Sequence, residues 1–158
     1  MKYLVFSDSH SSPKKIIEAI ELHMPRVAGV IFLGDGISDI EYAKKKFPET
    51  MFFCVKGNCD FSSDYPKEAL IDLDGIKILI THGDKYGVKT NYGLIASAAY
   101  KMGADAVFFG HTHIPVDIPV YFGEKRVHLF NPGSVRHGSS YGVINTSKNV
   151  LVTSHAKI

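Results

Sequence analysis

Short, uninterrupted apolar runs recur along the chain, and a polar cluster follows each of them. Five runs occupy the first two thirds of the sequence, at residues 3–6, 30–33, 51–55, 76–80 and 106–109. A continuous apolar run of this length is typical of a strand whose two faces are both buried. We therefore predict five buried strands in this part of the chain.

Three segments between or beside these runs have helical spacing instead, at residues 13–23, 38–46 and 91–102. In the first, Ile16, Ala19 and Ile20 fall on one stripe, while Ser12 and Pro13 suit an N-cap and a first helical position. Gly103 suits the end of the third segment. Strands that alternate with helices predict a layered α/β fold.

The last third of the chain has the pattern of hairpins. Residues 116–122 and 126–130 flank Gly123-Glu124, and residues 141–146 and 150–154 flank Ser147-Lys148-Asn149. These pairs predict antiparallel strands, which make a mixed sheet or two packed sheets. No linker, repeat or low-complexity tract interrupts residues 1–158, so we expect one domain.

Composition and charge describe an ordinary globular protein. Of the 158 residues, 45% are apolar and 22% are charged, and the formal net charge is +2. A charge this small gives no support to a nucleic-acid or membrane partner. Cys54 and Cys59 provide no disulfide framework, and the apolar N-terminal run is too short for a signal peptide. We expect a cytoplasmic protein.

Side chains that bind metal ions follow all five apolar runs. They are Asp8, His10, Asp35, Asn58, His82, His111 and His113. In open α/β sheets, ligands bind outside the carboxyl ends of the strands, so these residues are expected to meet in one cleft. The set is larger than one ion normally takes from a protein. It suits two divalent ions that share a carboxylate and hold a hydroxide between them.

The order of these motifs resembles the calcineurin-like metallophosphoesterase superfamily. The matching segments are Asp8-x-His10, Gly34-Asp35, Gly57-Asn58, His82-Gly83, Gly110-His111-x-His113 and Asn131-Pro132-Gly133-Ser134. Their spacing is most similar to the small prokaryotic phosphodiesterase subgroup, which shares its compact fold with the retromer scaffold subunit. The resemblance implies a two-sheet β-sandwich flanked by helices, in the four-layer arrangement of that superfamily.

The resemblance also implies a role for each ligand. Asp8, His10 and His113 would bind one ion, Asn58, His82 and His111 would bind the other, and Asp35 would bridge them. Manganese is the ion expected first, and nickel, zinc, iron and cobalt remain open. The implied activity is hydrolysis of a phosphodiester, in a small molecule or a nucleotide, by a metal-bridging hydroxide.

Two positions depart from the wider family. Cys59 stands where many members have a histidine that protonates the leaving group, and a thiol is a poor acid for that task. Ser38 stands where the family's protein phosphatases carry a further acidic residue. We therefore expect activated phosphodiesters to be better substrates than alkyl monoesters, and we do not expect a protein phosphatase.

Several alternatives stay open at this point. A catalytically weak, metal-supported scaffold for protein partners, of the retromer-subunit type, is the main rival function. A hydrolase of another bond is a third, although no HExxH segment is present. A homo-oligomer, the physiological substrate and the roles of Asp60, Asp84 and Arg136 are left undecided. The remaining histidines, His23, His128, His137 and His155, are expected outside the metal site.

Overall fold

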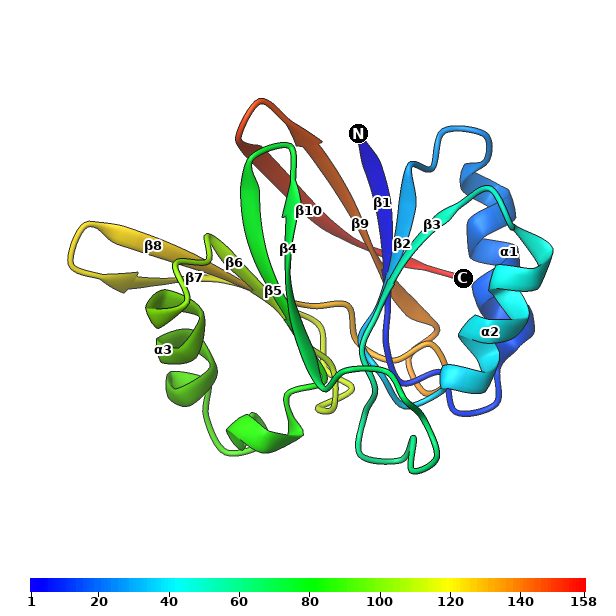
Figure 1. Ribbon diagram of the computed structural model, residues 1–158, viewed down its shortest axis with the longest axis horizontal. Helices are drawn as coiled ribbons and strands as arrows, with labels where there is room; N and C mark the ends of the chain where they lie inside the picture. The colour runs from blue at the N-terminus through cyan, green and yellow to red at the C-terminus, as the bar shows by residue number, and fades with distance from the viewer.

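The computed structural model describes residues 1–158 and contains two five-stranded sheets (Figure 1). The first sheet has the order β10-β9-β1-β2-β3 and the second the order β4-β5-β6-β8-β7. The strands of the first are β1 (Lys2–Phe6), β2 (Gly29–Phe32), β3 (Met51–Cys54), β9 (Ser140–Ser147) and β10 (Val150–Lys157). Those of the second are β4 (Glu68–Leu73), β5 (Ile76–Thr81), β6 (Ala106–Phe108), β7 (Val116–Phe122) and β8 (Lys125–Asn131).

Helices cover the outer face of each sheet. Figure 1 shows α1 (Pro13–His23) and α2 (Ile37–Lys46) beside the first sheet and α3 (Gly93–Lys101) beside the second. A short 3₁₀ helix, η1 (Asp84–Tyr86), follows β5. The result is a four-layer α/β/β/α arrangement, and the fold class that the sequence predicted is confirmed. None of the helices has the length and apolarity needed to cross a membrane.

Three apolar clusters hold the layers together. One lies between the sheets and includes Val5 and Ile31 from the first sheet with Ile78 and Phe108 from the second. The other two join the first sheet to α1 and α2, and the second sheet to α3. Because β2, β6 and β1 from Tyr3 onward are buried, these segments are continuous apolar runs rather than alternating ones.

Strand direction brings the polar loops to one edge of the sandwich. β1 pairs in parallel with β2, and β2 with β3. In the second sheet β5 pairs in parallel with β6. The carboxyl ends of these strands therefore point the same way within each sheet, and their loops lie together at the lower side of Figure 1.

Helix ends differ from the prediction where side chains accept hydrogen bonds from backbone N–H groups. The α3 helix begins at Gly93 rather than residue 91, because the side-chain Oδ1 of Asn91 accepts the N–H of Gly93. It ends as predicted at Gly103, whose positive φ of 72° closes a Schellman motif with Ala104. The expected N-cap bond from the Ser12 side chain is absent, and the Ser12 N–H instead donates to Asp39.

Strand β4 is an element that the sequence pattern did not predict. It forms a hairpin with β5 through Asp74 and Gly75, whose φ angles of 56° and 84° are those of a type I′ turn. An Asp-Gly pair between apolar runs is a strong hairpin signal, so the sequence did contain the information. The expectation that residues 1–158 form one domain stays a prediction.

Candidate metal centre

Six of the seven predicted ligands come together where the two sheets meet. The ligating atoms of Asp8, His10 and His113 lie within 4.8 Å of one another, and so do those of Asp8, Asp35 and His82. His111 joins them through its Nδ1, which is 3.2 Å from Nε2 of His82. The loops after β1, β2, β5 and β6 therefore supply one continuous cluster.

The spacing inside the cluster suits ligands that surround ions. Nε2 of His113 is 3.1 Å from Oδ1 of Asp8, and Nε2 of His82 is 3.4 Å from Oδ2 of Asp35. His10 lies between the two carboxylates, with its Nε2 3.8 Å from each of these oxygens. Two ligand atoms that are each about 2.1 Å from one ion lie about 3 to 4 Å apart. The distances between these ligand atoms therefore fit the coordination of divalent ions.

One oxygen of Asp8 is buried without a partner. Its Oδ2 accepts the hydroxyl of Ser7 and the backbone N–H of His111. Its Oδ1 is buried and forms no hydrogen bond, although Nε2 atoms of three histidines lie 3.1, 3.8 and 4.0 Å away. A buried carboxylate oxygen that lacks a donor costs free energy, and a cation at this point satisfies it.

The backbone fixes which nitrogen of His82 faces the cluster. Its Nδ1 lies 2.7 Å from the carbonyl oxygen of Leu33, so this nitrogen carries the proton and donates it. Its Nε2 is left to face Oδ2 of Asp35 and Nδ1 of His111. A backbone carbonyl that holds a ligand imidazole in this way is a common feature of metal sites.

Charge in the cluster favours an ionised Asp35. Burial of this carboxylate favours its neutral form, but His82 and the backbone N–H of Cys59 hydrogen-bond to it and hold its pKa well below the usual range. Burial likewise lowers the pKa of His82, but hydrogen bonding to Asp35 and the charge of Asp8 outweigh it, so the net shift is upward.

Backbone strain is concentrated at the same residues. Five of the seven predicted ligands have positive φ: Asp8 (54°), His10 (39°), Asp35 (59°), His111 (66°) and His113 (61°). A residue with a side chain pays roughly 1–2 kcal/mol for this conformation, and such residues collect at functional sites. The chain holds these side chains inward at a cost in stability, which supports a functional role.

Asp60 fixes the position of two ligand loops. Its carboxylate accepts the backbone N–H groups of Asp35 and Gly57 at 2.8 Å, and those of Gly36 and Ile37 at 3.0 Å. It therefore joins the loop after β2 to the loop after β3 and satisfies the first N–H groups of α2. The sequence left Asp60 between an orienting role and a turn role, and these contacts show that it orients the Asp35 loop.

Asn58, the seventh predicted ligand, lies in the loop that brings Cys59 to the cluster. It is exposed, and its Nδ2 contacts Sγ of the neighbouring Cys59 at 3.5 Å. Cys59 itself groups with His10 and Asp35, with ligating atoms within 4.8 Å. In the sequence analysis, Cys59 was interpreted as the lack of a proton donor at this position. The proximity of Cys59 to Asp35 could be foreseen only from its place in the same loop as Asn58.

His137 lies against the cluster although it was expected outside it. Its ring stacks on that of His113 with centroids 5.0 Å apart, and it lies 6.0 Å from His10. The neighbouring Arg136 donates to the backbone carbonyl of His10. The other three histidines do lie elsewhere, against Tyr141 (His23), Asp117 (His128) and Phe130 (His155).

Comparison with known sequences places the chain among phosphoesterases. A family model described as the calcineurin-like phosphoesterase superfamily domain matches residues 1–149. The probable metallophosphoesterase YsnB of Bacillus subtilis is 35% identical over 136 residues, which are 86% of this chain and 76% of that protein. The residues matched by the family model include all seven predicted ligands.

Solved structures show the same fold. A predicted phosphoesterase from Streptococcus pneumoniae superposes with a TM-score of 0.79 and 23% identity, covering 99% of this chain and 88% of its own. Vps29 from Entamoeba histolytica, in complex with Zn²⁺, superposes with a TM-score of 0.76 and 19% identity, covering 99% and 98%. The architecture is therefore common to a phosphoesterase and to Vps29.

Proposed function

The chain belongs to the calcineurin-like phosphoesterase superfamily, and from this we propose that it is a phosphodiesterase that uses two divalent ions. Asp8, His10 and His113 would hold one ion, and Asn58, His82 and His111 the other. Asp35 would bridge them. Manganese is the ion that we expect first, with nickel, zinc, iron and cobalt as alternatives.

The unpartnered Oδ1 of Asp8 is the observation that carries this proposal. It lies buried 3.1 Å from Nε2 of His113 and forms no hydrogen bond. When bound, divalent ions polarise a phosphate ester and lower the pKa of bound water from about 15.7 towards 7. The chain's own contribution is to hold the ligand side chains in place through Leu33, Ser7 and Asp60.

A cysteine at position 59 makes phosphodiesters with good leaving groups the better substrates. Partial burial, together with the hydrogen bond and charge of Asp35, raises the pKa of the Cys59 thiol to about 11. At neutral pH this thiol is neither a nucleophile nor an effective proton donor. A leaving group that needs no proton, such as an aryloxide, therefore loses least from the absence of a histidine here.

A polar cleft beside the cluster suits an anionic substrate. It has a volume of about 330 Å³ and is lined by Asn58, Asp60 and Asp84 together with Lys56 and Lys67. The ammonium of Lys56 donates to the carbonyl of Ser63, whereas that of Lys67 has no hydrogen-bond or ion-pair partner. Lys67 is thus free to contact a phosphate oxygen of a bound nucleotide or other small phosphodiester.

The substrate class is tested by comparing two esters on manganese-loaded protein. We expect bis(p-nitrophenyl) phosphate to be hydrolysed and an alkyl phosphomonoester to be hydrolysed far more slowly. Lys67→Gln should raise KM for the diester, and Lys148→Gln, a matched change on the remote β9–β10 turn, should not. Equal rates on the two esters would show that the diester preference is wrong.

A weak enzyme that acts mainly as a protein scaffold is the second candidate. The likeness in fold to Vps29 favours the scaffold function. Retention of the whole ligand set argues for catalysis, because a scaffold has no need of the strained backbone at these positions. Tight manganese binding without turnover of any phosphodiester would favour the scaffold.

Two further parts of the proposal concern location and assembly. Cys54 and Cys59 are both free, which agrees with the reducing cytoplasm as the site of action. Strands β10 and β7 are sheet edges, so a homo-oligomer that pairs them is compatible with the fold. The small net charge gives no reason to propose a nucleic-acid substrate.

A further inference from the structure

A second pocket lies between the two sheets, away from the metal centre. Its volume is about 450 Å³, and its lining comes from the starts of four strands: Gly75, Ile76, Asp105, Arg126, His128, Asn149 and Leu151. This volume is within the range of small-molecule sites, which is about 300–1,000 Å³. Ile76 begins β5 and Asp105 precedes β6, whereas His82 and His111 follow these strands. The pocket and the metal centre are therefore at opposite ends of the same strands.

Polar residues occupy positions where the inter-sheet core would otherwise continue. On β8, Phe130 packs between the sheets, while Val127 and Leu129 pack on the α3 side. Arg126 and His128 alternate with these two and so share the face of Phe130. Arg126 is exposed and His128 is half-buried, so the buried inter-sheet face of β8 ends at Phe130 and polar side chains line the rest of it.

The guanidinium of Arg126 has no partner within the protein. It forms no hydrogen bond, ion pair or ring contact with any residue of the chain. His128 beside it is held in place, since its Nε2 lies 2.8 Å from Oδ1 of Asp117 and 3.2 Å from Oγ1 of Thr153. An unpaired guanidinium next to a fixed imidazole is a suitable group for binding a carboxylate or a phosphate.

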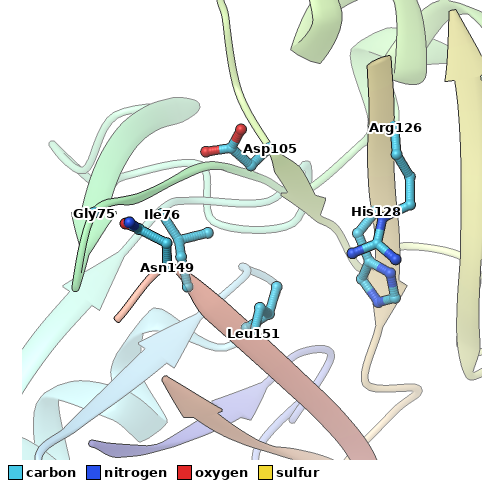
Figure 2. Close-up of a pocket in the computed structure, with 7 residues that line it drawn as sticks. All are labelled: Gly75, Ile76, Asp105, Arg126, His128, Asn149 and Leu151. Atoms are coloured by element: carbon cyan, nitrogen blue, oxygen red, sulfur yellow. The ribbon is translucent and has the colours of Figure 1, made fainter. Parts of the chain in front are cut away.

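The other walls offer different chemistry. Figure 2 shows Asn149 and Leu151 facing Arg126 and His128 across the pocket, with the Asp105 carboxylate near its upper rim. One oxygen of Asp105 accepts the N–H of Lys77, and the other accepts nothing. Ile76 and Leu151 provide an apolar floor. The pocket thus places a cationic group and a free carboxylate oxygen above apolar surface.

Contact between two hairpin turns closes one side of the pocket. The N–H of Asn149 donates to the carbonyl of Asp74 at 3.2 Å. Gly75 has a positive φ of 84°, which disfavours a side chain there, and a Cβ on it would displace the Oδ1 of Asn149. The β4–β5 turn of one sheet and the β9–β10 turn of the other therefore form a fixed rim.

We propose that this pocket binds a small organic anion that carries a phosphate or carboxylate at one end and a hydrogen-bond donor at the other. Arg126 pairs with the oxyanion, Asp105 accepts from an amino or hydroxyl group, and the body of the molecule lies on Ile76 and Leu151. This site does not depend on the metal centre and does not rest on the proposed activity.

Calorimetric titration of the full-length protein, with and without EDTA, tests the site. The probes are AMP and citrate, which present the oxyanion as a phosphate and as carboxylates, and inorganic phosphate, which lacks the donor end. We expect AMP or citrate to bind in EDTA, and the tighter of the two shows which oxyanion the site prefers. Arg126→Gln should weaken that binding about tenfold or more.

Two variants make the result specific. Lys125→Gln removes the same charge from the neighbouring residue, which lies over the ring of Tyr100, and should leave binding unchanged. Asp105→Asn should weaken AMP or citrate without weakening inorganic phosphate. Equal losses in Arg126→Gln and Lys125→Gln, or no binding of any probe at millimolar concentration, would overturn the proposal. Phosphodiesterase activity is a separate readout, so failure here leaves the proposed function intact.

Discussion

The carboxylate of Asp60 accepts the backbone N–H of Asp35 at 2.8 Å and holds the loop that presents the central carboxylate of the metal centre. The same carboxylate binds three further N–H groups, from Gly36, Ile37 and Gly57. This one carboxylate therefore joins the loop after β2 to the loop after β3. A residue that contacts no predicted ligand side chain thus sets the position of Asp35.

Asp60→Ala should lower both stability and metal affinity. Loss of hydrogen bonds from several N–H groups to one carboxylate is expected to cost about 2–4 kcal/mol in the free energy of unfolding. A displaced Asp35 should weaken manganese binding about 10- to 100-fold. Urea denaturation and chelator competition measure the two effects. Asp64→Ala, an exposed neighbour without hydrogen bonds, is the control, and a similar loss in both variants would contradict the orienting role.

Cys59→His should change substrate preference. The imidazole supplies an acid that titrates near neutral pH, whereas the present thiol has a pKa raised by burial and by Asp35 to about 11. We expect turnover of alkyl phosphomonoesters to rise relative to bis(p-nitrophenyl) phosphate, with Cys59→Ser giving no such rise. If the histidine and serine variants have the same selectivity, this position has no part in proton transfer.

His128 should make the metal-free protein less stable in mild acid. Burial lowers the pKa of His128, an effect that Asp117 opposes and Arg126 reinforces, and the net shift is downward. The unfolded chain then takes up a proton on this residue at a higher pH than the folded chain does. Stability supplied by neutral His128 is therefore present above about pH 6.5 and is lost as the pH falls towards the folded pKa.

The difference between wild type and His128→Asn isolates this effect from the other histidines. We expect the wild type to lose more unfolding free energy than the variant between pH 7 and pH 5, a range that brackets the ordinary histidine pKa of roughly 6.5. Denaturation midpoints at each pH provide the comparison. Parallel pH dependences in the two proteins would show that His128 keeps an ordinary pKa in the fold.

Much of the fold was readable in the sequence because the buried strands are apolar throughout. Residues 30–33 and 76–80 predicted strands, and the structure has β2 at Gly29–Phe32 and β5 at Ile76–Thr81. Strand β4 was missed because its pattern is mixed: Leu70 is exposed while Leu73 is buried. Its burial depends on pairing with β5, which a local pattern does not describe.

The residues of the candidate site could be predicted from the sequence for a different reason. Ligand residue types follow the strand ends, and parallel pairing brings those ends together, so Asp8, Asp35 and His82 could be grouped before their distances were known. The contact of His137 with His113 depends on how a loop far along the chain folds back. Pairing of Asp60 with four N–H groups depends on backbone directions that residue spacing does not encode.

Asp84 illustrates a neighbour without an orienting role. It lies two residues after His82, as Asp60 lies two residues after Asn58, and both were left undecided between an orienting role and a turn role. In the structure the Asp84 carboxylate forms no hydrogen bond or ion pair, although it lines the cleft beside Asn58.

Asp35→Asn tests the two-metal phosphodiesterase most directly. Protein stripped of metal and reloaded with manganese is assayed for bound metal per chain and for hydrolysis of bis(p-nitrophenyl) phosphate, with Asp64→Asn alongside. We predict that the wild type and Asp64→Asn, a change at an exposed residue outside the cleft, bind a pair of ions and turn over the diester. Asp35→Asn should bind fewer ions, keep its fold by circular dichroism and lose activity by about a hundredfold or more. Full metal content and full turnover in Asp35→Asn would contradict the account.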